Sequence, residues 1–261
     1  MNIEHGIQTI NNFNNTVKSD LYNQLERASD AFMEKTKEGL GSYFKKWTGD
    51  SFHQWSRKVE YPFIYQEISN FVSNNDKDLK VLDAGSGVTF FPYFIMEKYK
   101  NINIRCLDID KSYTPLFEYC NVHLGRSLSL DISSMQETKY CDNEFDVIYS
   151  VSVIEHTSDY ASIIREFKRI LKLSGKLVIL EFSEPSPFIN YIYKLYRSKF
   201  IPKLGEYVTG DKMSYQYLSE SIEVFEKQDQ LKTLIEKSGF ENVTYNNLMN
   251  GLVAIHKGYK C

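Results

Sequence analysis

The sequence predicts an α/β fold in which a parallel sheet carries helices on both faces. From residue 80 onward, short runs rich in aliphatic and aromatic residues alternate with helical segments; the runs are 79–84, 102–109, 145–151 and 175–182. Alternation of this kind is typical of a parallel sheet. The first run ends in a glycine turn, a common ligand site in such sheets. With 261 residues, 42% of them hydrophobic, the chain is long and apolar enough to bury a substantial core.

The first 75 residues are predicted to form a helical N-terminal cap. They contain no strand-like run, and apolar residues recur at three- and four-residue spacing, as in Val17, Leu21, Leu25, Ala28 and Phe32. The stretch 40–55 reads as an aromatic, turn-like connection, and a second helix is expected over 59–72. The polar break at 74–76 then separates the cap, residues 1–75, from a ligand-binding domain, residues 76–261.

A proline-containing insertion, residues 183–222, interrupts the alternation and is expected to form a lid. Beyond it the pattern predicts a helix over 228–238 that stops at Gly239. Two strands, 241–248 and 252–258, follow it. Asn250-Gly251 between these strands is a strong signal for a tight hairpin.

Composition excludes several functions. With 31 basic and 34 acidic residues the formal net charge is −3, which gives no electrostatic footprint for nucleic acid. The polar start lacks the apolar core of a secretory signal, and no run approaches the ~20 apolar residues of a membrane span. Four cysteines without CxxC spacing indicate reduced thiols in a cytoplasmic protein. Aromatic residues make up 15% of the chain, and they could line a pocket or fill the core.

The glycine turn is the first candidate cofactor site. In Val-Leu-Asp-Ala-Gly-Ser-Gly, the glycines Gly85 and Gly87 flank Ser86 and let backbone approach a ligand. A dinucleotide-binding dehydrogenase is the rival interpretation, but its third small residue is replaced by Phe90. Asp83 would repel a diphosphate and suits a cationic amino-acid group. These features favour S-adenosylmethionine.

Acidic residues after the next strands extend this site. Asp108, followed by Ile109, lies about 20 residues beyond the turn, where a carboxylate can accept hydrogen bonds from both ribose hydroxyls. The alternative for Asp108 is a helix N-cap, a role that Asp110 fits better.

The third and fourth strands supply the remaining candidates. Asp131 and Ile132 suit adenine, through a carboxylate for the exocyclic amine and a side chain that packs on the ring, although Asp131 could equally be a loop residue. Ser150 and Val151 end the fourth strand, which should face the methionine part of the cofactor and the methyl acceptor.

These motifs resemble those of the class I methyltransferases over residues 79–181. The matching pieces are VLDAGSG, LDID, LDIS, EFDVIYSVSVIEH and LKLSGKLVILEF. The resemblance implies a Rossmann-like, seven-stranded, mostly parallel sheet with an antiparallel last strand, and S-adenosylmethionine as cofactor. Segments 180–185, 201–222 and 238–260 are similar to the ubiquinone/menaquinone biosynthesis C-methyltransferases. That family methylates a ring carbon of a prenylated benzoquinol or naphthoquinol.

Departures from the family pattern concern the catalytic residues. After the fourth strand the family carries an Arg-Asn pair, whereas this chain has Glu155-His156. The family's N-terminal Tyr-Asp segment has no clear match in residues 1–60. His156 and Glu155 are therefore candidate general bases for the acceptor, or residues that cap the next helix or line the cofactor pocket. An ExxEH metal motif would need a glutamate where Ser152 stands, so no metal site is predicted.

The lid supplies the last candidates. An apolar, aromatic helix over 188–201 could admit an acceptor with a hydrophobic chain, contact a membrane surface peripherally, or pack on the core. Tyr215 could face the acceptor or serve packing. The leading hypothesis is a small-molecule C-methyltransferase acting on a quinol-type ring. The alternatives are an O- or N-methyltransferase of a specialised metabolite, a cofactor-binding protein without catalysis and, last, a dehydrogenase.

Overall fold

Seven strands form one sheet in the order β3-β2-β1-β4-β5-β7-β6. Their bounds are β1 Leu79–Ala84, β2 Ile102–Asp108, β3 Ser129–Ile132, β4 Phe145–Val151, β5 Leu171–Phe182, β6 Phe240–Leu248 and β7 Val253–Lys260. Strands β1 to β5 pair in parallel, and β7 runs antiparallel to both β5 and β6. The Rossmann-like sheet with an antiparallel last strand is confirmed. The computed structural model describes residues 15–44, 52, 57–184 and 227–261.

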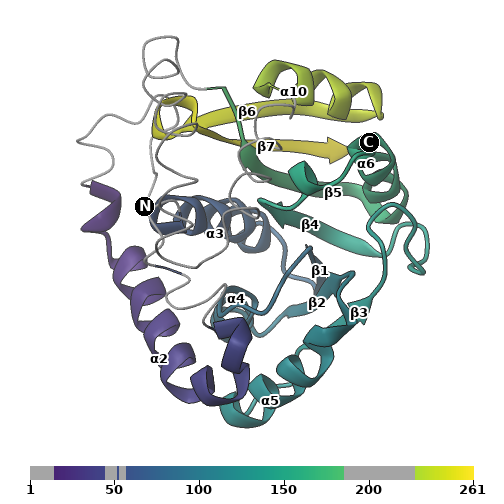
Figure 1. The fold of residues 1–261 in the computed structure, drawn as a ribbon. Coiled ribbons are helices and arrows are strands. Elements are labelled where there is room, and N and C mark those ends of the chain that lie inside the picture. Colours follow the sequence, from purple (N-terminus) through teal and green to yellow (C-terminus); the bar gives the residue numbers. More distant parts are fainter. Residues whose placement is uncertain (1–14, 45–51, 53–56, 185–226) are drawn as a thin grey trace, which may run out of the picture.

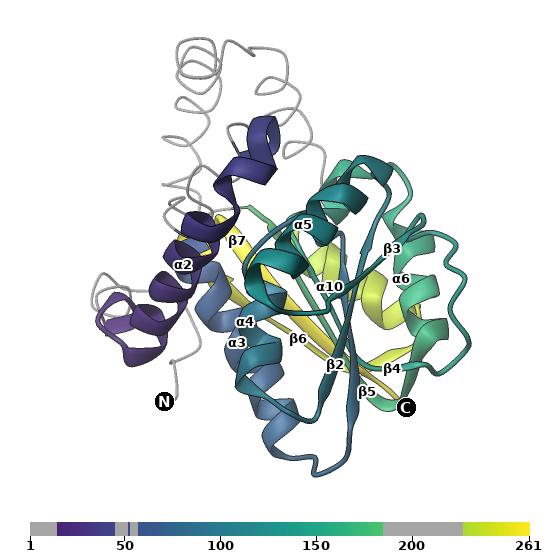
Figure 2. The same cartoon turned by 90° about the horizontal axis from the view of Figure 1, so that it is seen from below.

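Helices cover both faces of the sheet. Their bounds are α2 Asp20–Tyr43, α3 Arg57–Ser73, α4 Phe91–Lys98, α5 Thr114–Leu124, α6 Tyr160–Ile170 and α10 Gln228–Lys237. One hydrophobic cluster joins the sheet to α2, α3, α4 and α5, and a second joins it to α6 and α10. Figure 1 shows α3 beside the strands, and Figure 2 shows α3 and α4 on the opposite side of the sheet from α6.

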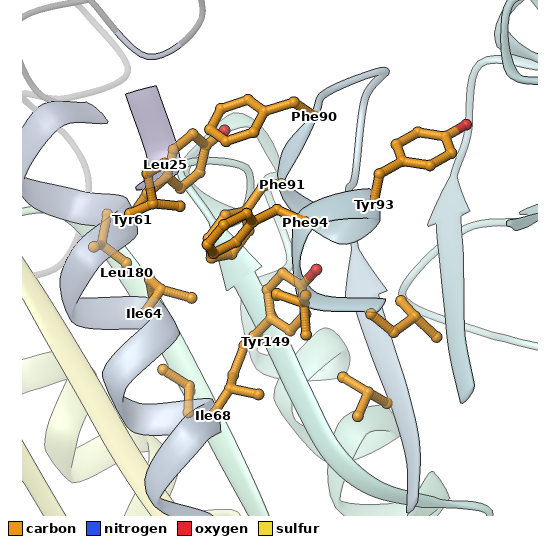
Figure 3. Packing of buried hydrophobic residues seen from close by; sticks show 14 of the residues in the cluster. Leu25, Tyr61, Ile64, Ile68, Phe90, Phe91, Tyr93, Phe94, Tyr149 and Leu180 are labelled. Atoms are coloured by element: carbon orange, nitrogen blue, oxygen red, sulfur yellow. The ribbon is translucent and has the colours of Figure 1, made fainter. Parts of the chain in front are cut away.

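Helix α3 is fixed to the sheet by aromatic packing and by a buried ion pair. Tyr61 stacks on Phe91 with ring centroids 4.4 Å apart, and Phe91 meets Tyr149 of β4 edge-on (Figure 3). Farther along the helix, the Glu67 carboxylate lies 2.6 Å from the Lys176 ammonium of β5, and both side chains are buried. Removing one partner of such a pair would leave a buried charge unpaired. These contacts fix the position of α3 on the sheet, and with it the position of the helix's first turn near the carboxyl ends of the strands.

Helix α2 continues farther than its sequence pattern predicts. Ser19 caps its start by accepting the Tyr22 backbone N–H at 3.1 Å. The helix runs on to Tyr43, although residues from 40 onward were expected to form a turn-like stretch. Leu40 is buried in the core, which favours continued helix, and only Gly41 adopts non-helical angles, φ 46° and ψ −115°. This kink sets the direction of the last residues of α2.

The C-terminal elements follow the sequence pattern closely. Gly239 has φ 90°, the left-handed geometry that ends α10. Asn250 and Gly251, with φ 58° and 90°, turn the chain between β6 and β7. The predicted helix stop and hairpin are both confirmed.

Most of the predicted lid, residues 183–222, lies outside the described residues, as do the helix expected over 188–201 and Tyr215. In the part of the chain that the structure describes, no helix is long and apolar enough to cross a membrane.

Candidate active site

The carboxyl ends of the parallel strands meet at one edge of the sheet. Register places Asp83 of β1 beside Cys106 of β2 and Tyr149 of β4, and Asp108 of β2 beside Ile132 of β3. Ligands of open α/β sheets bind beyond this edge. The structure thus brings the tips of β1, β2 and β3 together, as the motif order predicts.

The glycine turn after β1 is held by β2 and by the loop after β4. The backbone N–H groups of Gly85 and Ser86 donate to the Leu107 carbonyl at 2.8 and 3.1 Å. Gly85 has φ 77°, and a Cβ there would lie 2.4 Å from the Val153 Cγ1 atom. Gly87, with φ 50°, is the second left-handed residue of the turn. Glycine is required at position 85 by backbone conformation and by contact with the loop after β4.

Asp108 bridges this turn and the end of β2. Its Oδ2 accepts the Gly87 N–H at 3.0 Å, and its Oδ1 accepts the Asp110 N–H at 3.1 Å. The capping role belongs to Asp110, which begins the short 3-10 helix η2 (Lys111–Tyr113) by accepting the Ser112 N–H at 2.9 Å. Each carboxylate oxygen of Asp108 keeps capacity for a further donor. A ribose with two hydroxyls matches that capacity.

Asp83 is a buried carboxylate that lacks a cationic partner among the described residues. It is 5% exposed and accepts a hydrogen bond from the Tyr149 hydroxyl at 2.8 Å. Burial raises the pKa of Asp83 to about 7, and the nearby charge of Asp108 adds to the effect. A buried carboxylate is stabilised by a positive charge. The cationic amino-acid part of S-adenosylmethionine fits this position.

Two exposed isoleucines lie at the tips of β2 and β3: Ile109 directly follows β2, and Ile132 is the last residue of β3. Ile109 is 73% exposed and Ile132 is 38% exposed. Both adjoin the edge where Asp108 lies, and they offer an apolar surface to a flat ring. The Oδ2 atom of Asp131 already accepts the Tyr140 hydroxyl at 2.7 Å and lies 3.2 Å from Arg105 Nε. The adenine contact of Asp131 stays a prediction.

The tip of β4 lies beside the tips of β1 and β5, where the sequence predicts the methionine part of the cofactor and the acceptor. Ser152 has φ 54°, an uncommon backbone conformation for serine, and donates its N–H to the Leu180 carbonyl at 2.8 Å. Ser150 is fully buried, and its hydroxyl has no partner among the described residues. Val151 packs against the core. Cofactor contacts of Ser150 and Val151 stay predictions.

Glu155 and His156 lie in the 3-10 helix η3, Ile154–His156. Glu155 is 6% exposed, whereas the His156 side chain is 42% exposed, and its Nε2 lies 3.7 Å from Glu155 Oε1. Burial lowers the pKa of His156. The cap of α6 is Asp159, which accepts the Ser162 N–H at 3.0 Å, so His156 does not cap that helix.

A second buried carboxyl lies beside Glu155. Glu181, at the end of β5, is fully buried, and its Oε1 accepts the backbone N–H groups of Val153 and Ile154 at 2.9 and 2.7 Å. Burial raises the pKa of Glu155 to about 7 and that of Glu181 well above its usual range. Two buried carboxyls so close together are expected to share a proton. Sequence reasoning missed Glu181, although a glutamate inside the apolar run Leu-Val-Ile-Leu-Glu-Phe is a signal that could have found it.

Two further residues come from the N-terminal helices, and sequence reasoning missed both. The Tyr43 hydroxyl of α2 accepts the Val88 N–H at 2.7 Å, directly after the glycine turn. Arg57 of α3 donates from Nη1 to Ser152 Oγ at 3.1 Å and pairs with Glu60. No local pattern marks either residue, because the partners lie 45 and 95 positions away in the sequence.

Comparisons with known proteins agree with this geometry. Residues 64–260 match the model of the ubiE/COQ5 methyltransferase family. The chain is 40% identical, over 187 residues, to the ubiquinone/menaquinone biosynthesis C-methyltransferase UbiE of Rickettsia akari, an alignment that covers 69% of this chain and 75% of that protein.

Solved structures share the fold at low sequence identity. The CurJ carbon methyltransferase matches with a TM-score of 0.60 and 14% identity, covering 97% of this chain and 72% of that one. Phosphoethanolamine N-methyltransferase 2 of Haemonchus contortus, in complex with S-adenosylmethionine, matches with a TM-score of 0.56 and 11% identity, covering 83% and 60%. At this identity the likeness establishes the fold alone.

Proposed function

Because the chain belongs to the ubiE/COQ5 methyltransferase family and is an S-adenosylmethionine-dependent methyltransferase, we propose that it methylates a ring carbon of a quinol-type or prenylated aromatic acceptor. The observation that carries this proposal is the similarity to a ubiquinone/menaquinone biosynthesis C-methyltransferase over most of both chains. The buried carboxyl pair at the tips of β4 and β5 supports it, because methylation at a quinol ring carbon benefits from a base.

The cofactor half of the site follows from the strand tips. When bound, S-adenosylmethionine supplies a methyl carbon made electrophilic by a positive sulfur. Asp108 holds the ribose, Asp83 faces the amino-acid part, and Ile109 and Ile132 cover the adenine. Because Gly87 already donates to Asp108, the turn and the carboxylate are aligned before any ligand arrives.

The acceptor half supplies the base. Removing the proton from a ring hydroxyl raises the electron density at the neighbouring ring carbon, which then becomes the nucleophile. Glu155 suits this role better than His156, because burial brings its pKa to about 7. His156, half-exposed beside it, can pass the proton to solvent. Tyr215 stays a candidate acceptor contact that lies outside the described residues.

Mass spectrometry of lipid extracts from cells with and without the gene tests the acceptor. We expect loss of the gene to leave a quinone lighter by one CH₂ group, and the wild-type gene to restore the methylated form. A gene carrying Asp108→Ala is the matched control, because its weaker cofactor binding should restore less of the methylated form. An unchanged quinone pool would overturn the proposal.

N-methylation of an amine is the second candidate function. Among the described residues on the acceptor side, Glu60, Glu155 and Glu181 outnumber the guanidinium of Arg57, and an excess of buried carboxyl groups suits an ammonium. The same extracts separate the two functions, because an amine acceptor would leave the quinones unchanged and alter a polar metabolite.

Peripheral contact with a membrane would bring a prenylated acceptor to the enzyme. The helix predicted over 188–201 carries this hypothesis, and it lies outside the described residues. Flotation with anionic vesicles tests it; we expect binding that weakens with added salt.

A further inference from the structure

The first turn of α3 meets the tip of β4 through a mostly buried arginine. Arg57 is 21% exposed, and both of its hydrogen bonds, to Ser152 Oγ and to Glu60, use Nη1. Within the described part of the chain, Nε and Nη2 remain as donors. The guanidinium carbon also lies 5.7 Å from the centre of the Tyr61 ring, which fixes its position further. Arg57 is therefore a fixed cation, some of whose N–H groups have no acceptor among the described residues.

Three buried carboxyl groups extend from this cation: Glu60 pairs with Arg57, Glu155 interacts electrostatically with it, and Glu181 lies beside Glu155. Glu60 Oε1, both oxygens of Glu155 and Glu181 Oε2 are buried, and none accepts a hydrogen bond of good geometry within the described residues. The three side chains are 1%, 6% and 0% exposed. A proton shared by Glu155 and Glu181 satisfies part of this need. Because buried polar atoms are almost always satisfied in native proteins, the oxygens that remain call for a donor from outside the described residues. A hydroxyl of the acceptor is such a donor.

The charges in this cluster also require a proton. Three ionised carboxylates beside one guanidinium would leave excess negative charge in a buried site, which is unfavourable. Burial raises the pKa of Glu155, whereas the charge of Arg57 lowers it. Among the described residues, Glu60 from α3, Glu181 from β5 and His156 from η3 are the other titratable groups around Glu155. The cluster can thus accept or release a proton near neutral pH.

We propose that Arg57 binds the reacting oxygen of the acceptor and that Glu155 takes the proton from that oxygen, with Glu181 positioning Glu155. This inference rests on the proposed function and names the residues that perform its acid–base step. The acceptor O–H bond breaks, and its proton moves to a Glu155 oxygen. The electron pair stays on the acceptor oxygen as a negative charge, beside the Arg57 guanidinium.

The matched family region contains Glu155 and Glu181 but not the two residues from the first turn of α3. The family model begins at residue 64, so Arg57 and Glu60 lie before it. The anchoring of α3 through Glu67, inside the matched region, fixes where its first turn lies. Helix α3 therefore brings the Arg57 cation close to the loop after β4, which carries Glu155 and His156.

The test compares Arg57→Gln and Arg57→Lys with the wild type, using a prenylated naphthoquinol kept reduced as the acceptor. We expect Arg57→Gln to keep its affinity for S-adenosylhomocysteine but to lower the turnover rate about 100-fold, the scale of losing one oxyanion donor. Arg57→Lys should recover part of the rate. Lys58→Gln, a charge removal in the same helical turn, is the matched control and should leave the rate unchanged.

The pH profile separates a chemical role from a structural one. The wild-type rate should rise as pH increases through about 7, where Glu155 loses its proton. Without the Arg57 charge the pKa of Glu155 rises, so the midpoint for Arg57→Gln should move to higher pH. Added methylguanidine should partly restore the rate of Arg57→Ala.

Each outcome decides a different statement. Wild-type turnover together with an unchanged rate and midpoint in Arg57→Gln would overturn the inference and leave the proposed function intact. No wild-type turnover on the quinol, despite binding of S-adenosylhomocysteine, would overturn both. If Arg57→Gln lost affinity for S-adenosylhomocysteine and methylguanidine restored nothing to Arg57→Ala, Arg57 would be a structural residue, and the inference would fail.

Discussion

The two halves of the candidate site are built in different ways. At the tips of β1 to β3, Asp108 and Gly87 of the glycine turn are 21 residues apart in the sequence, and the Gly87 N–H donates to the Asp108 carboxylate. The other N–H groups of the turn, from Gly85 and Ser86, donate to the Leu107 carbonyl. At the tips of β4 and β5, carboxyl groups from α3, η3 and β5 come together, and several of their oxygens have no described donor.

This difference separates a preorganised region from one that depends on its ligand. Satisfied buried groups hold their positions without a ligand, whereas unsatisfied ones gain from a proton or a hydroxyl. Variants on the two sides should therefore differ in effect. Those of the cofactor half should alter binding of the cofactor, and those of the acceptor half should alter stability, pH dependence or turnover.

The largest expected effect is on cofactor binding, from Gly85→Ala. The added Cβ would collide with Val153, and the left-handed backbone costs about 1–2 kcal/mol more for alanine. Together these should weaken S-adenosylhomocysteine binding more than about 100-fold, measured by calorimetry. Gly125→Ala, with φ 61° but open space around its Cβ, is the control and should bind normally. Equal affinity in both variants would show that the turn does not touch the cofactor.

Breaking the anchor of α3 should have an effect of similar size, on stability. Glu67→Ala leaves the buried Lys176 ammonium without its partner, so the free energy of unfolding should fall by about 3–5 kcal/mol in denaturant titrations. Glu97→Ala removes an exposed pair with Arg126 and should cost at most about 1 kcal/mol. A similar small loss in Glu67→Ala would mean that the buried pair does not hold α3 in place.

Asp108→Ala should weaken cofactor binding moderately. Losing charge-assisted hydrogen bonds to the ribose should cost about 1–3 kcal/mol, measured with S-adenosylhomocysteine by calorimetry. Asp110→Asn, at the neighbouring exposed cap, should leave the affinity unchanged. If the two variants behaved alike, the assignment of the ribose to Asp108 would be wrong.

The smallest expected effect is the pH dependence of stability. Glu155 has a folded pKa of about 7, above its ordinary value of 4.5. Its contribution to stability is therefore full below about pH 4.5 and is lost as pH rises through 7. Thermal unfolding of Glu155→Gln should show a smaller decline between these pH values than the wild type.

Asp83 titrates in the same direction, because burial also raises its pKa to about 7. Asp83→Asn should therefore also reduce the loss of stability between about pH 4.5 and 7. This variant allows the cofactor half to be compared with the acceptor half. A wild-type melting temperature that stays level across this pH range would contradict both assignments.

The sequence predicted where the residues of the proposed cofactor half lie, because their signals are local. Asp83, the glycine turn and Asp108 lie at the ends of strands, and parallel pairing brings such ends to one edge. Within that half, Asp131 shows the limit of local reasoning, since its contact with Arg105 and Tyr140 depends on pairing and on a loop. Its position at the end of β3 therefore does not by itself determine whether Asp131 binds adenine.

By itself, the sequence determined the alternation of strands and helices, the hairpin at Asn250-Gly251 and the acidic residues after β1 and β2, because periodicity and turn chemistry act over a few residues. Only the tertiary structure decided that α2 carries Tyr43 to the glycine turn and that α3 carries Arg57 to Ser152. Those contacts depend on how buried helices pack on the sheet, and the packing is set by residues distant in the chain, such as Glu67 and Lys176.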